Sequence, residues 1–260
     1  MANKLPKLLA STLLIPALLT STLSFAQDKK ENPFSAKIKA AMKAETRSDK
    51  DKERDANRLP VQTLEFFGIK EDMKVLELIP GGGWYTSLLA PALADKGELH
   101  VGVGTGRVKT LVEKDPAFSK VKVVNEGTKL KWNPDIRLIT FDAIEFDEKN
   151  YDAVLTFRNY HNMTVEARME LNKHIFKSLK PGGIYGVIDH TRRHMEQDNR
   201  ENHRRADPVM AIHEILQAGF EFVDHSDLHY RADDELEYEV GRKSVTGNSD
   251  RWTFLFKKPK

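Results

Sequence analysis

The chain has 260 residues, with 41 Lys and Arg against 39 Asp and Glu, and it contains no cysteine. This near balance of charge gives no sign of binding to nucleic acid or to an anionic membrane surface. The absence of cysteine excludes disulfides, thiolate nucleophiles and zinc–thiolate sites.

The first 26 residues have the features of a cleaved secretory signal peptide. Lys4 and Lys7 give a positive start, an apolar run covers 8–19, and 24–26 places small residues at the two positions that a signal peptidase reads. The run is shorter than the roughly 20 residues that span a membrane. We therefore expect cleavage after Ala26, a periplasmic or secreted protein, and no membrane association after cleavage.

Residues 27–59 form a highly charged arm before the main domain. A weak helical pattern covers 36–44, and the signs of the charges alternate along 47–55. Such alternation is typical of a solvated face or a lead-in arm. Pro60 then opens a short helix, and Gly68 ends it. We therefore place the folded domain at 60–260.

Apolar strands and helices alternate after residue 70. The expected strands are 74–79, 98–103, 151–157, 184–188, 220–223 and 252–257. The expected helices are 84–94, 107–114, 164–179 and 208–219. This alternation predicts an α/β fold with a doubly wound, mostly parallel sheet covered by helices on both faces. The last two strands have no helix between them, which predicts a C-terminal antiparallel hairpin.

The third strand has two candidates. One is Val121–Val124 and the other is Arg137–Phe141. Both are short apolar runs, and the pattern does not decide between them.

The stretch VLELIPGGGWYT, residues 75–86, runs from a strand through three glycines into a helix. Ligands of open α/β sheets bind at the carboxyl ends of strands, where glycine permits tight turns and close approach of a ligand to the backbone. Glu77 at the strand end would repel a pyrophosphate and would suit a cationic amino or sulfonium group. The loop therefore favours S-adenosylmethionine over NAD.

Two later segments extend this pattern, Thr156–Met163 and Leu179–Gly183. With the glycine-rich stretch, they make the chain resemble class I S-adenosylmethionine-dependent methyltransferases, and more narrowly a group of exported bacterial predicted methyltransferases. The resemblance covers most of the chain after about residue 47. It implies a Rossmann-like methyltransferase domain over 60–260, with seven strands in the order 3-2-1-4-5-7-6.

The resemblance also implies a cofactor site. Its expected residues are Glu77, Pro80, Gly81, Gly82, Gly83, Tyr85, Thr86, Asp142 and Ala143. The last two resemble the acid–small pair that meets adenine if 137–141 is the third strand, whereas Asp142 is a loop residue if 121–124 is. The chain departs from the family at 99–104, which lacks the acid that usually holds the ribose hydroxyls.

The expected catalytic residues are Arg158, Asn159, Tyr160 and His161, at the end of the fourth strand. His161 is the best candidate for a general base, because a histidine titrates near neutrality. In the alternative, Asn159 and His161 only cap the next helix and connect loops. Asp189-His190 at the end of the fifth strand would either assist His161 or only form strand-end hydrogen bonds, and the second role is slightly favoured.

A second group of cations lies between the fifth strand and the next helix. Its members are Arg192, Arg193, Arg200, His203, Arg204 and Arg205, with acids between them. The segment is either a lid that clamps an anionic substrate or a solvated loop. The remaining histidines lack metal-ligand spacing, so we expect no metal.

Two functions follow from these features. The first is S-adenosylmethionine-dependent methyl transfer to a small-molecule acceptor. The alternative is a periplasmic ligand-binding or interaction protein that keeps the methyltransferase fold without catalysis. The missing acid and an export route away from the cytosolic cofactor supply favour the alternative. The intact Glu77 loop and the polar segment 158–161 favour the enzyme. The oligomeric state is left open.

Overall fold

The computed structural model of the protein describes residues 32–260, and the expected signal peptide lies outside this part of the chain. Within residues 32–260, no helix is both long enough and apolar enough to cross a membrane.

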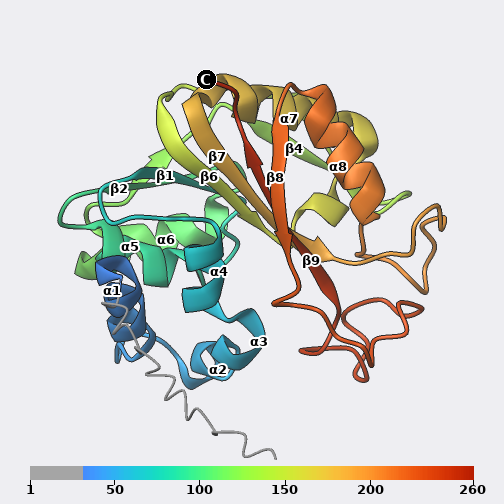
Figure 1. Ribbon diagram of the computed structural model, residues 1–260, viewed down its shortest axis with the longest axis horizontal. Helices are drawn as coiled ribbons and strands as arrows, with labels where there is room; N and C mark the ends of the chain where they lie inside the picture. Colours follow the sequence, from blue (N-terminus) through green and yellow to red (C-terminus); the bar gives the residue numbers. More distant parts are fainter. Residues whose placement is uncertain (1–31) are drawn as a thin grey trace, which may run out of the picture. The chain divides into compact units, whose positions relative to one another are not determined.

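Seven strands form one mixed sheet (Figure 1) in the order β3-β2-β1-β6-β7-β9-β8. They are β1 Lys74–Leu78, β2 Glu98–Gly102, β3 Lys122–Val124, β6 Tyr151–Phe157, β7 Leu179–His190, β8 Glu221–Ser226 and β9 Arg251–Lys257. Pairing is parallel from β3 to β7, whereas β9 pairs antiparallel with both β7 and β8. Counted along this sheet alone, the order is 3-2-1-4-5-7-6, so the predicted topology and the C-terminal antiparallel hairpin are confirmed.

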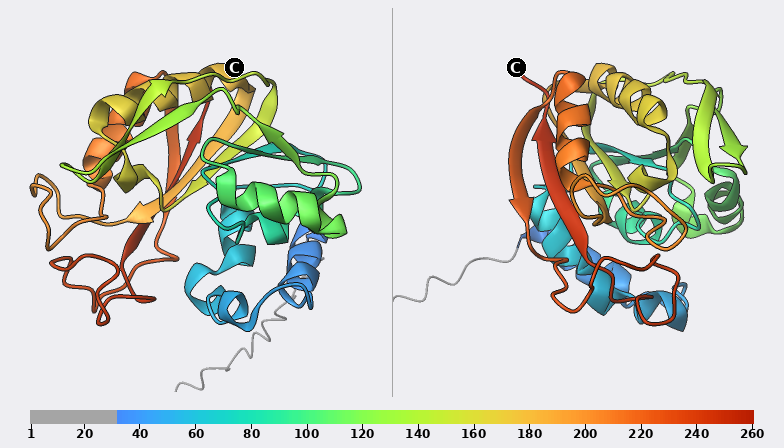
Figure 2. Two further views of the ribbon diagram at one scale, coloured as in Figure 1. Left: turned by 180° about the vertical axis from the view of Figure 1, so that it is seen from behind. Right: turned by 90° about the vertical axis from the view of Figure 1, so that its right-hand side faces the viewer.

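Helices cover both faces of the sheet (Figure 2). They are α1 Pro33–Met42, α2 Asp49–Lys52, α3 Asp55–Arg58, α4 Pro60–Phe66, α5 Thr86–Leu93, α6 Gly106–Lys114, α7 Val165–Ser178 and α8 Pro208–Gln217, with short 3-10 turns at Pro116–Phe118 and Tyr160–Asn162. Successive strand side chains point to opposite faces, so Val75 joins the core under α1, α4 and α5, whereas Leu76 joins the core under α7 and α8. The doubly wound α/β prediction is therefore confirmed.

The helix boundaries follow the local sequence signals. Pro60 is the first residue of α4, and Gly68 adopts a φ of 68° just after it. Asp207 caps α8 by accepting hydrogen bonds from the backbone N–H groups of Val209 and Met210.

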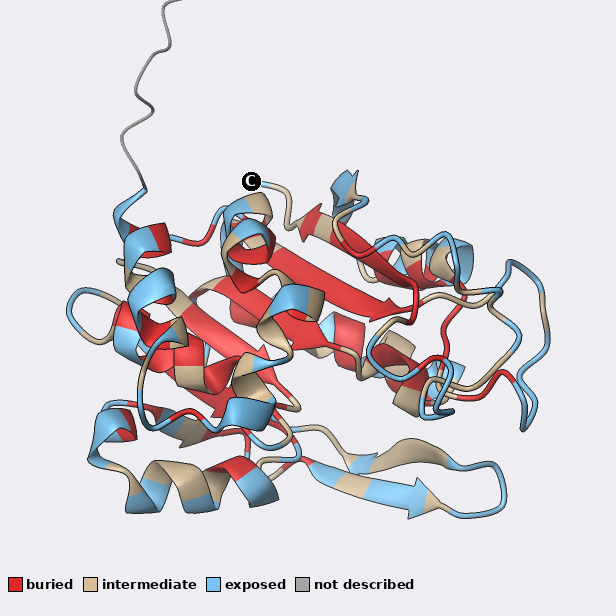
Figure 3. Ribbon diagram, turned by 90° about the horizontal axis from the view of Figure 1, so that it is seen from below, coloured by how far each residue is buried: buried red, intermediate tan, exposed pale blue. Residues whose placement is uncertain are grey.

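The third strand of the sheet is β3, so the first of the two candidates is correct. The other candidate falls in β5 Leu138–Ala143, which pairs with β4 Lys129–Asn133 in a separate two-stranded sheet. Figure 3 shows this hairpin as mostly exposed or half-buried, in contrast to the buried central strands. Both runs are short and partly apolar, and only the packing of the chain shows which one joins the main sheet.

The charged N-terminal arm is integrated into the fold rather than simply solvated. Phe34 and Ile38 of α1 are buried in the core beneath α5. Arg47 is also buried, and its Nη2 lies 2.7 Å from Oδ1 of Asp55. Because α1 buries apolar side chains and Arg47 is ion-paired, this arm forms part of the domain surface next to the glycine-rich stretch.

Candidate functional site

The chain turns sharply between β1 and α5, and we call residues 79–83 the glycine loop. Gly81 and Gly83 adopt φ values of 61° and 84°, and Ile79 adopts 52°. A Cβ on Gly83 would lie 2.9 Å from Cδ2 of Leu111 in α6, whereas a Cβ on Gly82 would meet nothing within 4 Å. Gly83 is therefore required for packing, and Gly82 leaves the outer side of the loop open.

A cavity of about 440 Å³ lies over the glycine loop, and we call it the loop cavity. Five residues of the expected cofactor site line it: Glu77, Pro80, Gly81, Gly82 and Tyr85. Arg158 and Asn159 of the fourth-strand loop line it as well. The structure thus brings the first and fourth strand ends together, because these strands are neighbours in the sheet.

Glu77 is buried at the floor of this cavity, with 2% of its surface exposed. Thr86 Oγ1 donates a hydrogen bond to Oε2 of Glu77 at 2.6 Å. Burial raises the pKa of Glu77 from its ordinary 4.5 to about 8, while the Thr86 hydrogen bond and the nearby Arg58 charge lower it less strongly. Glu77 therefore holds a proton at neutral pH until a cation binds beside it.

The other expected cofactor residues fall into two groups. Gly83 and Thr86 lie beneath the loop and support it. Asp142 and Ala143 line a different cavity, of about 570 Å³, beside α7. The structure thus removes Asp142 and Ala143 from the candidate site, because they belong to the β4–β5 hairpin and not to the third strand of the sheet.

The ends of β2 and β3 border a further cavity of about 340 Å³. It contains one acid, Glu126, which is two residues beyond β3 and forms an ion pair with Lys109 at 3.0 Å. Gly104 and Asn125 line the same cavity. The missing second-strand acid therefore has no replacement on β2, and Glu126 is the carboxylate that the fold places nearby.

A second cavity, of about 480 Å³, adjoins the loop cavity. Arg54, Arg58 and Arg158 line both cavities, so the two share a wall. His161 and His190 line the second cavity. A ligand over the glycine loop and another in the second cavity would therefore meet at these three arginines.

His161 is held by a buried carboxylate. Its Nδ1 lies 2.5 Å from Oδ1 of Asp189, and its backbone N–H donates to Oδ2 of Asp189 at 2.8 Å. Asp189 is fully buried. Because a carboxylate accepts from Nδ1–H, the lone pair of the neutral ring lies on Nε2, which has no hydrogen-bond partner within residues 32–260. His161 is therefore oriented as a general base.

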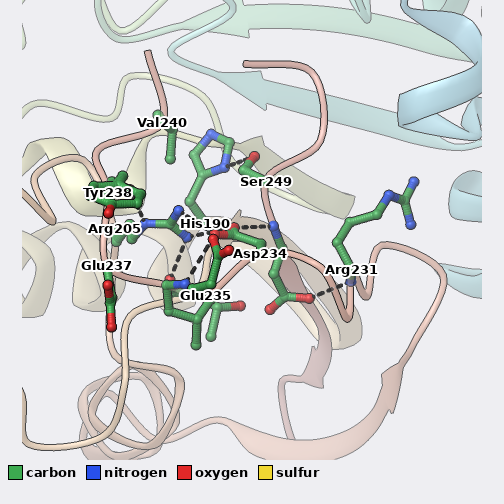
Figure 4. Close-up of polar contacts among 12 residues, drawn as sticks. His190, Arg205, Arg231, Asp234, Glu235, Glu237, Tyr238, Val240 and Ser249 are labelled. Carbon is green, nitrogen blue, oxygen red and sulfur yellow. Dashed lines mark hydrogen bonds and ion pairs between the residues drawn. The ribbon is translucent and has the colours of Figure 1, made fainter. Parts of the chain in front are cut away.

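His190 lies beside His161, with 5.5 Å between the ring centroids. Its Nδ1 is 2.8 Å from Oγ of Ser249 (Figure 4). Burial, and after it the nearby His161 and Arg158, lower the pKa of His190 well below its usual range. His190 is therefore neutral, and it supplies a polar wall rather than a charge.

Tyr160 does not belong to the site, which corrects our expectation. It is 1% exposed, its hydroxyl donates to Oε2 of Glu214 at 2.7 Å, and it accepts from Nδ2 of Asn172 at 3.0 Å. Glu214 is also ion-paired with Arg168 at 2.6 Å. His161 and Asn162, which follow Tyr160 in the 3-10 turn, line the second cavity, whereas the side chain of Tyr160 points to the other side of the turn.

Replacing Tyr160 by phenylalanine is expected to lower the free energy of unfolding by about 1–2 kcal/mol, because Glu214 and Asn172 lose a buried partner. Denaturant unfolding measures this change. Ligand binding in either cavity should stay within twofold of the unchanged protein. A large loss of binding without loss of stability would return Tyr160 to the site.

Asn159 connects two loops. Its Nδ2 donates to the backbone carbonyls of Ile79 and Phe157, at 3.0 Å each. The side chain therefore connects the glycine loop to the end of β6, which is the loop-connecting role of the alternative given above for Asn159.

The cationic segment after β7 is largely neutralised by acids. Arg205 is fully buried against Asp234 at 2.8 Å (Figure 4), and Arg192 lies 3.2 Å from Asp198. Arg204 lines the second cavity but is paired with Glu239. Because these arginines already form ion pairs within the chain, they are not available to bind an anionic substrate as the lid interpretation requires.

The arginines that sequence reasoning missed come from the N-terminal arm and from β9. Arg58 is 6% exposed and lies over the ring of Trp84, with 4.2 Å between its Cζ and the ring centroid. Arg54 and Arg251 line the second cavity. Their positions depend on contacts between segments nearly 200 residues apart, and only Trp84 beside the glycines hinted at a cation partner.

Within residues 32–260, no group of three or more His, Asp or Glu side chains could hold a metal ion. The site is therefore described by its carboxylates, histidines and arginines.

No model of a known protein family matches the chain. Solved structures with a similar fold include a SAM-dependent methyltransferase from Aquifex aeolicus, with a TM-score of 0.55 and 16% identity over 86% of this chain and 97% of that one. They also include the [4+2]-cyclase SpnF, with a TM-score of 0.52 and 15% identity over 78% of this chain and 80% of that one. The chain therefore has the Rossmann-like fold found in S-adenosylmethionine-dependent methyltransferases.

Proposed function

We propose that the protein is an S-adenosylmethionine-dependent methyltransferase that acts on a small molecule. The observation that carries this proposal is the buried Glu77 carboxyl beside an open glycine loop, at the switch point of a methyltransferase-like sheet. The fold alone does not name the activity, since similar sheets serve other reactions.

The residues of the loop cavity fit this cofactor. Among the described residues, Thr86 is the one hydrogen-bond donor to Glu77, so a carboxylate oxygen remains for the amino group of the cofactor. Gly82 leaves space for close approach to the backbone. When bound, S-adenosylmethionine supplies an electrophilic methyl group and a neutral leaving group.

In this proposal the acceptor occupies the second cavity, and His161 removes its proton. Nε2 of His161 takes the proton, and Asp189 keeps the ring oriented and stabilises the imidazolium. The non-catalytic alternative gains no support from the site, because this His–Asp pair is intact. We also propose export to the periplasm or beyond, supported by the signal-like residues 1–26.

Calorimetric titration with S-adenosylmethionine and S-adenosylhomocysteine tests the proposal. We expect binding at micromolar ligand, and about tenfold weaker binding for Gly82→Ala, because the added methyl group occupies the open side of the loop. Gly82→Ala should leave the unfolding free energy nearly unchanged.

Gly83→Ala is the matched control. It should lower the unfolding free energy by about 1–3 kcal/mol, because the new Cβ meets Leu111 and the residue keeps a positive φ. No heat at millimolar ligand, or equal binding by Gly82→Ala and the unchanged protein, would refute the proposed cofactor site.

A further inference from the structure

Within the part of the chain that the structure describes, four arginines line the second cavity without a carboxylate partner. We call Arg54, Arg58, Arg158 and Arg251 the arginine cluster. Within residues 32–260, the side chains of Arg54, Arg58 and Arg158 form no ion pair or hydrogen bond. Among the described residues, Arg251 donates only to backbone carbonyls, to Asn57 at 2.6 Å and to Ser249 at 3.4 Å.

Arg58 shows most clearly that a partner is missing. Arg58 is 6% exposed, and its Nε has no hydrogen-bond partner within residues 32–260. Among the described residues, the guanidinium of Arg58 lies over the face of Trp84, and the Glu77 carboxyl that its charge influences has its pKa raised to about 8 by burial. A buried guanidinium without a counter-ion destabilises the folded chain, so such groups are kept where a ligand supplies the charge.

The cluster members also repel one another. Burial first, and then the charges of Arg158 and Arg54, hold the pKa of Arg58 well below its usual range. Burial and Arg158 likewise lower the pKa of Arg251. An anion bound among these residues would remove both the repulsion and the desolvation penalty.

The acids nearby do not neutralise the cluster. Of the residues that line the second cavity, six are Lys or Arg and one, the exposed Glu53, is acidic. Asp189 lies behind the wall and is bound to His161 and to the backbone N–H of His190. Asp250 accepts from the backbone N–H of Arg231 at 2.8 Å. After β7, Arg192, Arg193, Arg204 and Arg205 are paired with acids, whereas Arg200 is exposed to solvent, so buried arginines without an acid are a feature of this cavity among these residues.

We propose that the second cavity binds a small molecule through two or more oxyanion groups, carboxylate or phosphate, which the arginine cluster holds. Four guanidinium groups from three segments, the N-terminal arm, the β6 loop and β9, converge on one volume of about 480 Å³, which suits a small polyanion. The identity of this molecule rests on the proposed function: it is the methyl acceptor, and its reactive atom lies beside Nε2 of His161.

Titration calorimetry with pyrophosphate and with citrate, at constant ionic strength and without S-adenosylmethionine, tests the proposal. We expect at least one of them to bind, and the stronger of the two identifies phosphate or carboxylate as the preferred group. Arg58→Met and Arg158→Met should each weaken this binding by about 10- to 100-fold, the range for a lost charge-assisted hydrogen bond. Arg200→Met, which removes an exposed arginine outside the cavity, is the matched control.

A structural role for Arg58 predicts a different result. If Arg58 awaits an anion, Arg58→Met should raise the melting temperature of the ligand-free protein, because an unpaired buried charge is removed. If Arg58 only supports the fold, the melting temperature should fall, and that result would overturn its assignment as an anion ligand.

Two further outcomes would overturn the proposal. The first is no binding of either anion at millimolar concentration, or equal weakening by Arg200→Met. The second is mutual displacement of the anion and S-adenosylmethionine, which would assign the cluster to the cofactor carboxylate. Failure of the cofactor titration alone would refute the methyltransferase function and leave the anion site standing, so the two failures are distinguishable.

Discussion

Replacing His161 by asparagine is expected to lower the rate of methyl transfer by about 10²- to 10⁴-fold, the usual contribution of a general base. The affinity for S-adenosylmethionine should not change, because His161 lines the second cavity and not the loop cavity. The asparagine amide can still donate to Asp189, so the variant should remain folded. The rate is measured as S-adenosylhomocysteine formed in the presence of the acceptor.

Asp189 gives the control for this variant. Asp189→Asn no longer stabilises the imidazolium of His161, so it should slow the reaction by itself. In the double variant with His161→Asn, the two losses should not add, because both residues act through one proton transfer. Additive losses would indicate that Asp189 acts separately through the fold. An unchanged rate in His161→Asn would show that His161 only connects loops.

Glu77→Gln is expected to have opposite effects on binding and on stability. The neutral amide should weaken S-adenosylmethionine binding by about 10- to 100-fold, since a charge-assisted hydrogen bond is lost. The same change should make the ligand-free protein more stable at pH 8, by roughly 2–4 kcal/mol, because no carboxylate must be buried. Calorimetric titration and denaturant unfolding measure the two effects.

The pH dependence of the stability gain follows from the pKa of Glu77. Because its pKa rises from 4.5 to about 8 on folding, the native chain holds a proton that the unfolded chain has lost between these values. The stability linked to this proton is fully present below pH 4.5 and is lost as the pH rises through 8. The advantage of Glu77→Gln should therefore grow over this range.

Binding of a cation should also expel the proton from Glu77. Titrations at pH 7 in buffers of different ionisation enthalpy should show release of nearly one proton by the unchanged protein and none by Glu77→Gln. In Glu77→Gln, Thr86 can still donate a hydrogen bond to the side-chain amide, so the variant should keep this contact. Equal proton release by both proteins would show that Glu77 does not face the cofactor.

Sequence periodicity determined the fold to a large degree. The alternation of apolar strands and helices, together with Pro60, Asp207 and the glycines, predicted the doubly wound sheet and its C-terminal hairpin, and the structure confirms both. Such signals are local, because a strand or a cap is specified by residues a few positions apart. Glu77 and the glycine loop were found in the same way, since the loop and its strand are contiguous.

The tertiary structure alone decided which segment is the third strand and what surrounds the cavities. Asp142 was misplaced because two short apolar runs compete equally for one edge of the sheet until the chain packs. Tyr160 was misplaced because its hydroxyl meets Glu214, 54 residues away. Arg58 lies in the highly charged arm 27–59, where no local pattern predicts burial, yet it is buried against Trp84. Burial and charge pairing depend on contacts that are distant in sequence, so local patterns located the loop but could not reveal the unpaired arginines beside it.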